Sequence, residues 1–276
     1  MENKTSKEIA NLIFKEILKN KPQLKESFNA TKDQIGFFFI DDLLPESIAL
    51  ECFNVFPKKS DMRCLKSIRE YKYVSAQMNK HHELLERVLY AFQEPQIVEL
   101  IGSICSIESL CADNSLYAGG ISLMEKDNFL NPHLDNSHDA ERQRWRVLNL
   151  LYYVTPNWEI GNGGHLELWP NGPKKAPLLI ESKFNRLVVM ATHDTSWHSV
   201  NKVEEDKDRC CISNYYFSDS PLKETDRFHV TKFRGRPEDT FTNLLLDLDS
   251  SLRMLIRRFF KKGIRKNPHI YKKEHQ

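Results

Sequence analysis

Apolar side chains in the first third of the chain recur at helical spacing. Residues 7–19 carry one apolar stripe and predict a helix. The aromatic run at 35–40 predicts a short strand, and Pro45 suits the first turn of a second helix. Residues 82–105 again show helical periodicity, with an expected break at Glu94–Pro95 because the residue before a proline avoids helical backbone angles.

The pattern changes after residue 113. Short apolar and β-branched runs appear, separated by turn-rich segments such as NPHLDN and TPNWEIGNGG. Several short strands with turn signals between them indicate a sandwich or barrel, here of about eight strands, and disfavour alternating β/α units. The apolar runs are SLYAGGISLM, VLNLLYYV, HLELW, RLVVMA and CCISNYYF.

Helical spacing returns after Pro221. Apolar residues between 241 and 260 step by three or four, with Arg and Lys on the other face. We therefore expect an α+β, mainly β fold: a jelly roll with supporting N-terminal helices and a C-terminal helical extension. Within one structural domain, residues 1–112 would be the helical support, 113–220 the jelly-roll core and 221–276 the basic extension.

Composition and charge narrow the class of protein. The 276 residues are 40% hydrophobic, as in ordinary globular proteins, and no apolar run is long enough to span a membrane. Residues 253–276 carry nine basic side chains against one acidic side chain, so the rest of the chain is mildly acidic. This distribution argues against a nucleic-acid groove on the body. We expect a cytoplasmic protein whose six cysteines are reduced thiols.

The segment NPHLDNSHD holds the candidate chemistry. His133 and Asp135 are two residues apart, so on a strand their side chains project to the same side. His198, after the run RLVVMA, is the best candidate for a third ligand. Two imidazoles and a carboxylate suit a non-haem Fe(II) that must leave open positions, but catalytic zinc can use the same set. A lone H-x-D motif also occurs by chance in surface turns.

Arg209 opens the strand RCCISNYYF, where a guanidinium could hold a carboxylate inside a barrel. Ser213 shares its strand parity and could contact the same carboxylate. Tyr153, from VLNLLYYV, could add a phenol donor. A salt bridge at the surface end of a strand is the competing interpretation of Arg209.

The order of these motifs resembles the 2-oxoglutarate- and Fe(II)-dependent dioxygenases of the prolyl 4-hydroxylase-like branch, among them the hypoxia-type prolyl hydroxylases and their bacterial relatives. The similar region spans about residues 117–219, and IGFFFIDDLLP resembles the segment that opens these domains. The resemblance implies a double-stranded β-helix. It maps the metal ligands onto His133, Asp135 and His198, and the residues that bind 2-oxoglutarate onto Arg209, Tyr153 and Ser213.

The resemblance also implies the activity. Fe(II), 2-oxoglutarate and O₂ would serve hydroxylation of an aliphatic C–H bond with release of succinate and CO₂, and ascorbate is a further candidate cofactor. Asp135 favours hydroxylation, because related halogenases have a small residue at that position. Leu123 departs from relatives that have a tyrosine ten residues before the first ligand, so one hydrogen bond to 2-oxoglutarate is expected to be missing or replaced.

The substrate stays open between peptidyl proline, a free amino acid and another small metabolite. His165 and His138 are weak candidates for substrate contacts, with packing and solvent exposure as their alternatives. Two other functions compete: a metal-binding scaffold without catalysis, and a zinc hydrolase with the same three ligands. For the basic tail, packing of its apolar stripe on the body is favoured over contact with a membrane surface. The oligomeric state cannot be read from the sequence.

Overall fold

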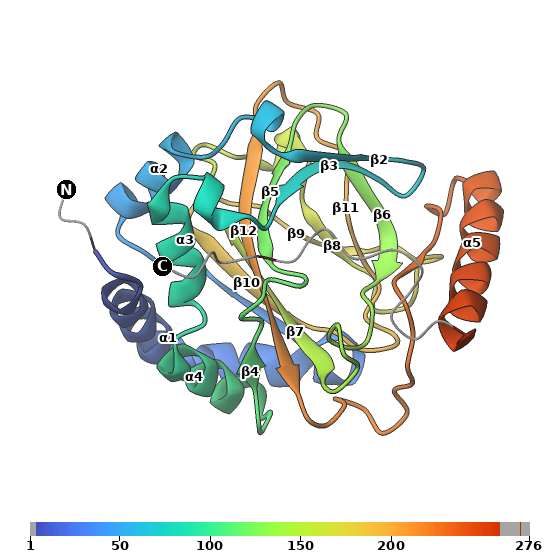
Figure 1. Cartoon of the computed structure of the whole chain (residues 1–276), viewed down its shortest axis with the longest axis horizontal. Helices are drawn as coiled ribbons and strands as arrows, with labels where there is room; N and C mark the ends of the chain where they lie inside the picture. The colour runs from blue at the N-terminus through green and yellow to red at the C-terminus, as the bar shows by residue number, and fades with distance from the viewer. Residues whose placement is uncertain (1–3, 260–270, 272–276) are drawn as a thin grey trace.

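A long N-terminal helix supports the molecule from one side (Figure 1). The computed structural model describes residues 4–259 and 271. Helix α1 (Ser6–Ile35) begins at a capping box in which Thr5 and Glu8 bond reciprocally. The predicted helix over 7–19 is thus the first half of a longer one. Its second half buries widely spaced residues such as Leu24 and Phe28 between charged side chains, so the apolar period is weak there.

Three further helices complete this support. They are α2 (Glu46–Asn54), α3 (Glu83–Ala91) and α4 (Pro95–Cys105), and the predicted break at Glu94–Pro95 is confirmed. Helix α1 packs against α3, α4 and β1, and α3 contacts β12. Single 3₁₀ turns lie at Lys59–Asp61 (η1), Met78–Lys80 (η2) and Ile160–Asn162 (η3).

One curled antiparallel sheet forms the centre of the molecule (Figure 1). Its main path runs in the order β1-β10-β7-β12-β5-β3-β6-β11-β8-β9. Strand β13 pairs with β6, β2 with β3, and β4 with β12. The strands are β1 (Phe37–Ile40), β2 (Arg63–Lys66), β3 (Glu70–Ser75), β4 (Cys111–Ala112), β5 (Gly120–Met124), β6 (Phe129–Leu134), β7 (Trp145–Tyr153), β8 (Leu166–Leu168), β9 (Leu178–Ile180), β10 (Arg186–Ala191), β11 (His198–Val200), β12 (Arg209–Ser218) and β13 (Lys232–Phe233).

The predicted class, a mainly β jelly-roll fold with N-terminal helices, is confirmed. The sheet also takes strands from both flanking segments. The hairpin β2–β3 lies between the first helices in sequence and pairs with β5 and β6, and β13 comes from the C-terminal segment. The hairpin was not predicted, because its apolar residues are few and alternate with charges over only four to six positions.

The two faces of the sheet have different roles. On β7, Leu148, Leu150 and Tyr152 join the large apolar cluster under the helices. Leu151 and Tyr153, of opposite parity, belong to a smaller cluster on the inner face. Cys210 and Cys211 divide between the same two clusters, and all six cysteines are free thiols, as expected. The inner face, enclosed by the curl of the sheet, is therefore the face available for a site.

Helix α5 (Thr240–Phe259) lies at the opposite end of the molecule from α1 (Figure 1). The expectation that its apolar stripe packs on the body is wrong for its described side chains. Phe241, Leu244 and Leu248 are at least 60% exposed. The helix contacts the body through its other side, by burial of Leu246 and an ion pair between Asp249 and Arg69. Among the described residues, we find no helix long and apolar enough to cross a membrane.

Candidate metal centre

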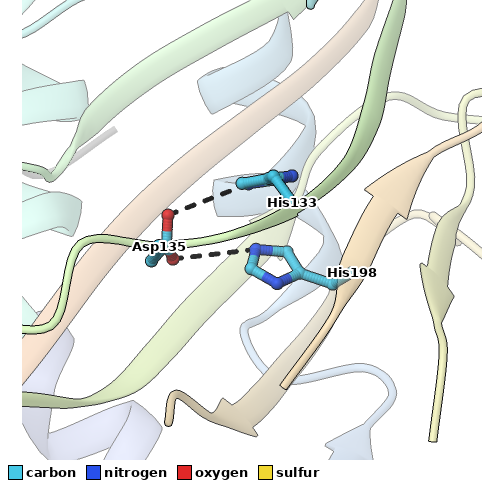
Figure 2. A group of neighbouring side chains, drawn as sticks. All are labelled: His133, Asp135 and His198. Atoms are coloured by element: carbon cyan, nitrogen blue, oxygen red, sulfur yellow. Dashed lines mark ion pairs between the residues drawn. The ribbon is translucent and has the colours of Figure 1, made fainter. Parts of the chain in front are cut away.

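Three side chains from separate parts of the sequence meet on the inner face of the sheet (Figure 2). His133 on β6 lies opposite His198 on β11 in the strand register, and Asp135 follows β6. Asp135 Oδ1 is 3.8 Å from His133 Nε2, and Asp135 Oδ2 is 3.6 Å from His198 Nε2. One ligand atom from each residue lies within 4.8 Å of the others. This spacing allows all three to bind one ion.

Backbone carbonyls orient both imidazoles. His133 Nδ1 lies 3.0 Å from the carbonyl oxygen of Asn131, and His198 Nδ1 lies 2.9 Å from that of Ser196. A carbonyl only accepts hydrogen bonds, so each Nδ1 carries the proton and donates it. The Nε2 lone pairs are then free and point toward Asp135. Outer hydrogen bonds of this kind orient histidines that bind metal ions.

Burial of His133 and the positive groups beside Asp135 keep these two residues in their ligating protonation states. Burial lowers the pKa of His133 to about 3, with His198 nearby adding to the effect. Burial alone would raise the pKa of Asp135, but His198 and Arg146 outweigh it and hold the pKa below its ordinary value. Near neutral pH the centre therefore offers a neutral His133 and a carboxylate.

A cavity of about 430 Å³ opens beside the three residues. Its wall combines residues of β2, β3, β5, β7 and β12 with His133, Asp135 and His198. Arg209, the first residue of β12, lines the cavity although it is only 3% exposed to solvent. Small-molecule sites commonly have volumes of this order.

Of the predicted 2-oxoglutarate residues, Tyr153 contacts Arg209 and Ser213 lies further along the same strand as Arg209. Its guanidinium lies 4.7 Å from the centre of the Tyr153 ring, and its Nε donates to Ser182 Oγ at 3.2 Å. The Tyr153 hydroxyl is buried and has no hydrogen-bond partner among the described residues, and burial raises its pKa to about 12. Ser213 lines the cavity, with its hydroxyl donating to the Gly120 carbonyl at 3.2 Å.

The two weak histidine candidates do not line this cavity. His165 is fully buried, its Nε2 lies 2.9 Å from the Ile160 carbonyl oxygen, and its Nδ1 accepts from the backbone of Ser182. The His138 ring contacts the Trp145 ring at a tilted angle and hydrogen-bonds to Ser137. The contacts of both histidines are with neighbouring protein groups, and neither side chain lines the cavity in which a substrate would bind.

Leu123 also faces away from the cavity. It is 1% exposed and belongs to the apolar cluster beneath the helices, whereas Ser122 and Met124 on the same strand line the cavity. The inner wall of β5 thus offers a hydroxyl and a thioether, and no phenol stands at position 123.

Arg146 was missed by the sequence analysis. It lines the cavity and lies 3.5 Å from Asp135 Oδ1. Strict alternation along β7 would put it on the same face as Leu148, away from Tyr153. A β-bulge prevents this, because Leu148 pairs with Tyr216 while Arg146 pairs with Phe217, which leaves Val147 as an extra residue. No feature of the sequence marks this bulge.

A second cluster, His193, Asp194 and Asp226, also has ligand-type atoms within 4.8 Å. Its hydrogen bonds explain it without an ion. His193 Nδ1 accepts from the Thr195 backbone, so its proton lies on Nε2. Asp226 accepts from the backbone amides of Asp194 and Lys223. It therefore acts as a carboxylate that fixes a loop.

The first cluster fits a divalent metal. Asp135 Oδ2 is buried and has no hydrogen-bond partner among the described residues, and the two Nε2 atoms approach one carboxylate oxygen each. Two imidazole nitrogens and one carboxylate oxygen on one side of an ion are the ligand set of non-haem Fe(II) oxygenases. The donor atoms of this site thus match Fe(II).

Comparisons with known proteins agree with this geometry. Residues 119–217 match the family model described as the 2OG-Fe(II) oxygenase superfamily. Among solved structures, a Pseudomonas putida prolyl-4-hydroxylase is 16% identical, with a TM-score of 0.52 over 71% of this chain and 98% of that one. A prolyl 4-hydroxylase from Phytophthora capsici is 17% identical, with a TM-score of 0.53 over 92% and 81%.

A third similar structure comes from Trichoplax adhaerens. This prolyl hydroxylase, solved with a hypoxia inducible factor peptide fragment, is 18% identical, with a TM-score of 0.51 over 73% of this chain and 92% of that one. A search of curated proteins finds no match. At these identities, the structural similarity is evidence for the fold alone.

The matched segment contains all three residues of the cluster together with Arg209, Tyr153 and Ser213. The family implies Fe(II), 2-oxoglutarate and O₂ as cofactors, in agreement with the donor atoms of the cluster. Residues 119–217 therefore match the 2OG-Fe(II) oxygenase superfamily, and the chain has a prolyl 4-hydroxylase-like fold.

Proposed function

We propose that the chain is a hydroxylase that inserts an oxygen atom into an aliphatic C–H bond while 2-oxoglutarate is converted to succinate and CO₂. The observation that carries the proposal is the shared cavity. Three metal-type ligands and a deeply buried arginine line the same space, although they come from distant parts of the sequence. A carboxylate at position 135, rather than a small residue, favours hydroxylation over halogenation.

His133, Asp135 and His198 would hold the metal. The carbonyls of Asn131 and Ser196 fix the rings so that each Nε2 lone pair faces the ion. The three ligands come from the adjacent strands β6 and β11 and the residue that follows β6, and all three line the cavity. Bound Fe(II) supplies the redox chemistry by which O₂ oxidises 2-oxoglutarate and the substrate.

Arg209 would bind the far carboxylate of 2-oxoglutarate. A guanidinium keeps its charge when buried and presents paired donors to a carboxylate. No carboxylate of the described residues forms an ion pair with it. The Tyr153 hydroxyl, which has no hydrogen-bond partner among the described residues, would supply a further donor from the neighbouring strand β7. The Ser213 hydroxyl would serve 2-oxoglutarate only as it gives up its bond to the Gly120 carbonyl. Burial of Arg209 and Tyr153 would exclude water, which strengthens their contacts.

The reaction also needs a C–H bond held beside the metal. The cavity between β2–β3 and β7–β12 is where a substrate would enter the site. One structural neighbour was solved with a peptide fragment, so a peptide and a small metabolite both remain candidates. Fixing the substrate at a set distance lowers the barrier by removing the entropy cost of encounter.

Succinate formation tests the proposal. The full chain, supplied with Fe(II), 2-oxoglutarate and O₂, should release succinate, and replacement of Fe(II) by Zn(II) should stop the release. Asp135→Ala should be inactive. Asp127→Asn is the matched control, because it removes an exposed carboxylate whose positive φ an asparagine also tolerates. Hydrolytic activity with Zn(II), or metal binding without any turnover, would contradict the proposal.

A further inference from the structure

Three cations line the cavity in addition to Arg209. They are Arg63 and Lys72 on the β2–β3 hairpin and Arg146 on β7. In the hairpin register, Arg63 pairs with Val74 and Leu65 with Lys72, and all four of these residues line the cavity. One face of the hairpin therefore presents two basic side chains to the space beside the metal-type ligands.

Arg146 is the most deeply buried of the three. It is 6% exposed, and its Nε has no hydrogen-bond partner among the described residues. Its guanidinium lies 4.4 Å from the centre of the Tyr215 ring, and Asp135 is the carboxylate beside it, at 3.5 Å. An aromatic face stabilises a cation less than a carboxylate does, so Arg146 depends on Asp135 for charge compensation.

The loaded site changes this balance, and this step rests on the proposed function. A divalent ion and Arg209 together carry three positive charges. Asp135 and the two carboxylates of 2-oxoglutarate carry three negative charges, so the centre is neutral by itself. Arg146 is then a buried cation whose neighbouring carboxylate is committed to the metal. A buried charge without a counter-charge is costly.

The hairpin adds to this excess of positive charge. Arg63 is exposed, and within the described part of the chain no carboxylate forms an ion pair with it. Lys72 pairs with Glu70 at 3.1 Å, but Glu70 does not line the cavity. The half of the cavity that faces the hairpin thus has basic groups from two walls. Asp135 is the one acidic residue among the described residues that line the cavity.

We propose that the substrate is a small molecule with an anionic group, a carboxylate or a phosphate, which Arg146 and Arg63 bind while its reactive carbon faces the metal. The volume supports a small molecule, because about 430 Å³ must hold both 2-oxoglutarate and the substrate. An anion held between the two arginines supplies the counter-charge that Arg146 lacks in the loaded site.

Binding of matched probes tests this inference. The full chain is loaded with Zn(II) and saturating 2-oxoglutarate, which fills the Arg209 end without turnover. Calorimetry then compares cyclohexanecarboxylate with cyclohexanecarboxamide, and cyclohexyl phosphate with cyclohexanol. We expect at least one anion to bind about tenfold or more tightly than its neutral partner, as one charge-assisted contact would give. The pair with the larger difference identifies the anionic group as carboxylate or phosphate.

Two variants locate the effect. Arg63→Gln combined with Lys72→Gln should reduce the preference for the anion about tenfold. Lys66→Gln is the control: it removes one positive charge from the same hairpin, but Lys66 does not line the cavity, so this variant should keep the preference. Equal binding of anion and neutral partner, or equal loss of preference in the control, would overturn the inference.

Succinate release separates this inference from the proposed function. If the wild-type chain releases succinate but does not discriminate between the probes, the anionic subsite is wrong and the oxygenase assignment stands. If the chain discriminates between the probes but releases no succinate under any condition, the subsite stands and the hydroxylase proposal fails.

Discussion

Arg209 and Arg146 are two buried arginines of one cavity with different surroundings. Each lies over a tyrosine ring, and neither is more than 6% exposed. Arg209 has neutral neighbours, Ser182 and Met124, and no ion pair among the described residues. Arg146 lies beside Asp135. If the proposed function holds, the same type of side chain serves two purposes: Arg209 would bind a dianionic co-substrate, and Arg146 would compensate the charge of Asp135 until an ion binds.

The largest expected effect comes from the carboxylate that distinguishes the two arginines. Asp135→Ala should lower turnover more than about 100-fold. Loss of a residue that only hydrogen-bonds to a metal ligand already costs about 10–100-fold, and Asp135 would be a ligand itself. It should also unfold at a lower temperature than His133→Ala, since Arg146 loses the carboxylate beside it. Steady-state succinate release and thermal unfolding measure the two effects. Equal stability of the two variants would show that Arg146 does not depend on Asp135.

Removal of Arg209 should affect the co-substrate. We expect Arg209→Ala to raise the KM for 2-oxoglutarate on the order of 30-fold or more, because a charge-assisted pair left without one partner costs about 2–5 kcal/mol. Arg186→Gln is the control: Arg186 is also buried and stacked on an aromatic ring, but it pairs with Asp41 outside the cavity. An unchanged KM in Arg209→Ala would contradict the role assigned to this end of the cavity.

Groups near the Arg146 end of the cavity should also make the folding stability sensitive to acid. A small pocket behind it is lined by His193 and His229, and burial lowers the pKa of each to about 4. Both are neutral in the folded state, whereas the unfolded chain protonates near pH 6.5. The free energy of unfolding should therefore be highest above pH 6.5 and should fall as the pH drops from 6.5 to 4. The expected loss is up to about 3 kcal/mol for each residue. Urea unfolding at several pH values measures this loss.

Replacing both histidines by glutamine should flatten that part of the pH curve. His82→Gln is the control, because His82 is exposed at the start of α3. If the double variant keeps the full acid dependence, other buried groups must cause it.

Ser213 should contribute least. Its hydroxyl already donates to the Gly120 carbonyl, so Ser213→Ala removes one neutral contact and should raise the KM for 2-oxoglutarate about fivefold. Ser218→Ala, at the far end of β12, should leave that KM unchanged because Ser218 bonds to Glu108 outside the cavity. A larger increase in the KM for 2-oxoglutarate in Ser213→Ala than in Arg209→Ala would contradict the expected ranking of the two residues.

Local pattern was enough to predict several parts of the molecule. The break at Glu94–Pro95 follows from proline geometry, and the opposite directions of Cys210 and Cys211 follow from strand alternation. The motif positions of His133, Asp135, His198 and Arg209 anticipated which side chains gather at the cavity. These features depend on neighbours in sequence or on a motif with fixed spacing.

The parts that were missed depend on contacts between distant segments. The bulge at Val147, which turns Arg146 into the cavity, exists because of the pairing of β7 with β12. Arg63 and Lys72 reach the cavity because their hairpin pairs with β5 and β6. The stripe of α5 has the pattern of a buried helix, but the helix meets the body through Leu246 and Asp249. Periodicity shows that a face is apolar and does not say what covers it.

Anaerobic titration of the full chain with Fe(II), followed by 2-oxoglutarate, tests the central claim most directly. We predict one Fe(II) per chain, lost in Asp135→Ala and kept in Arg209→Ala, and one 2-oxoglutarate that binds only after the metal and is lost in Arg209→Ala. Fe(II) binding that survives in Asp135→Ala, or 2-oxoglutarate binding that is indifferent to both the metal and Arg209, would contradict the account.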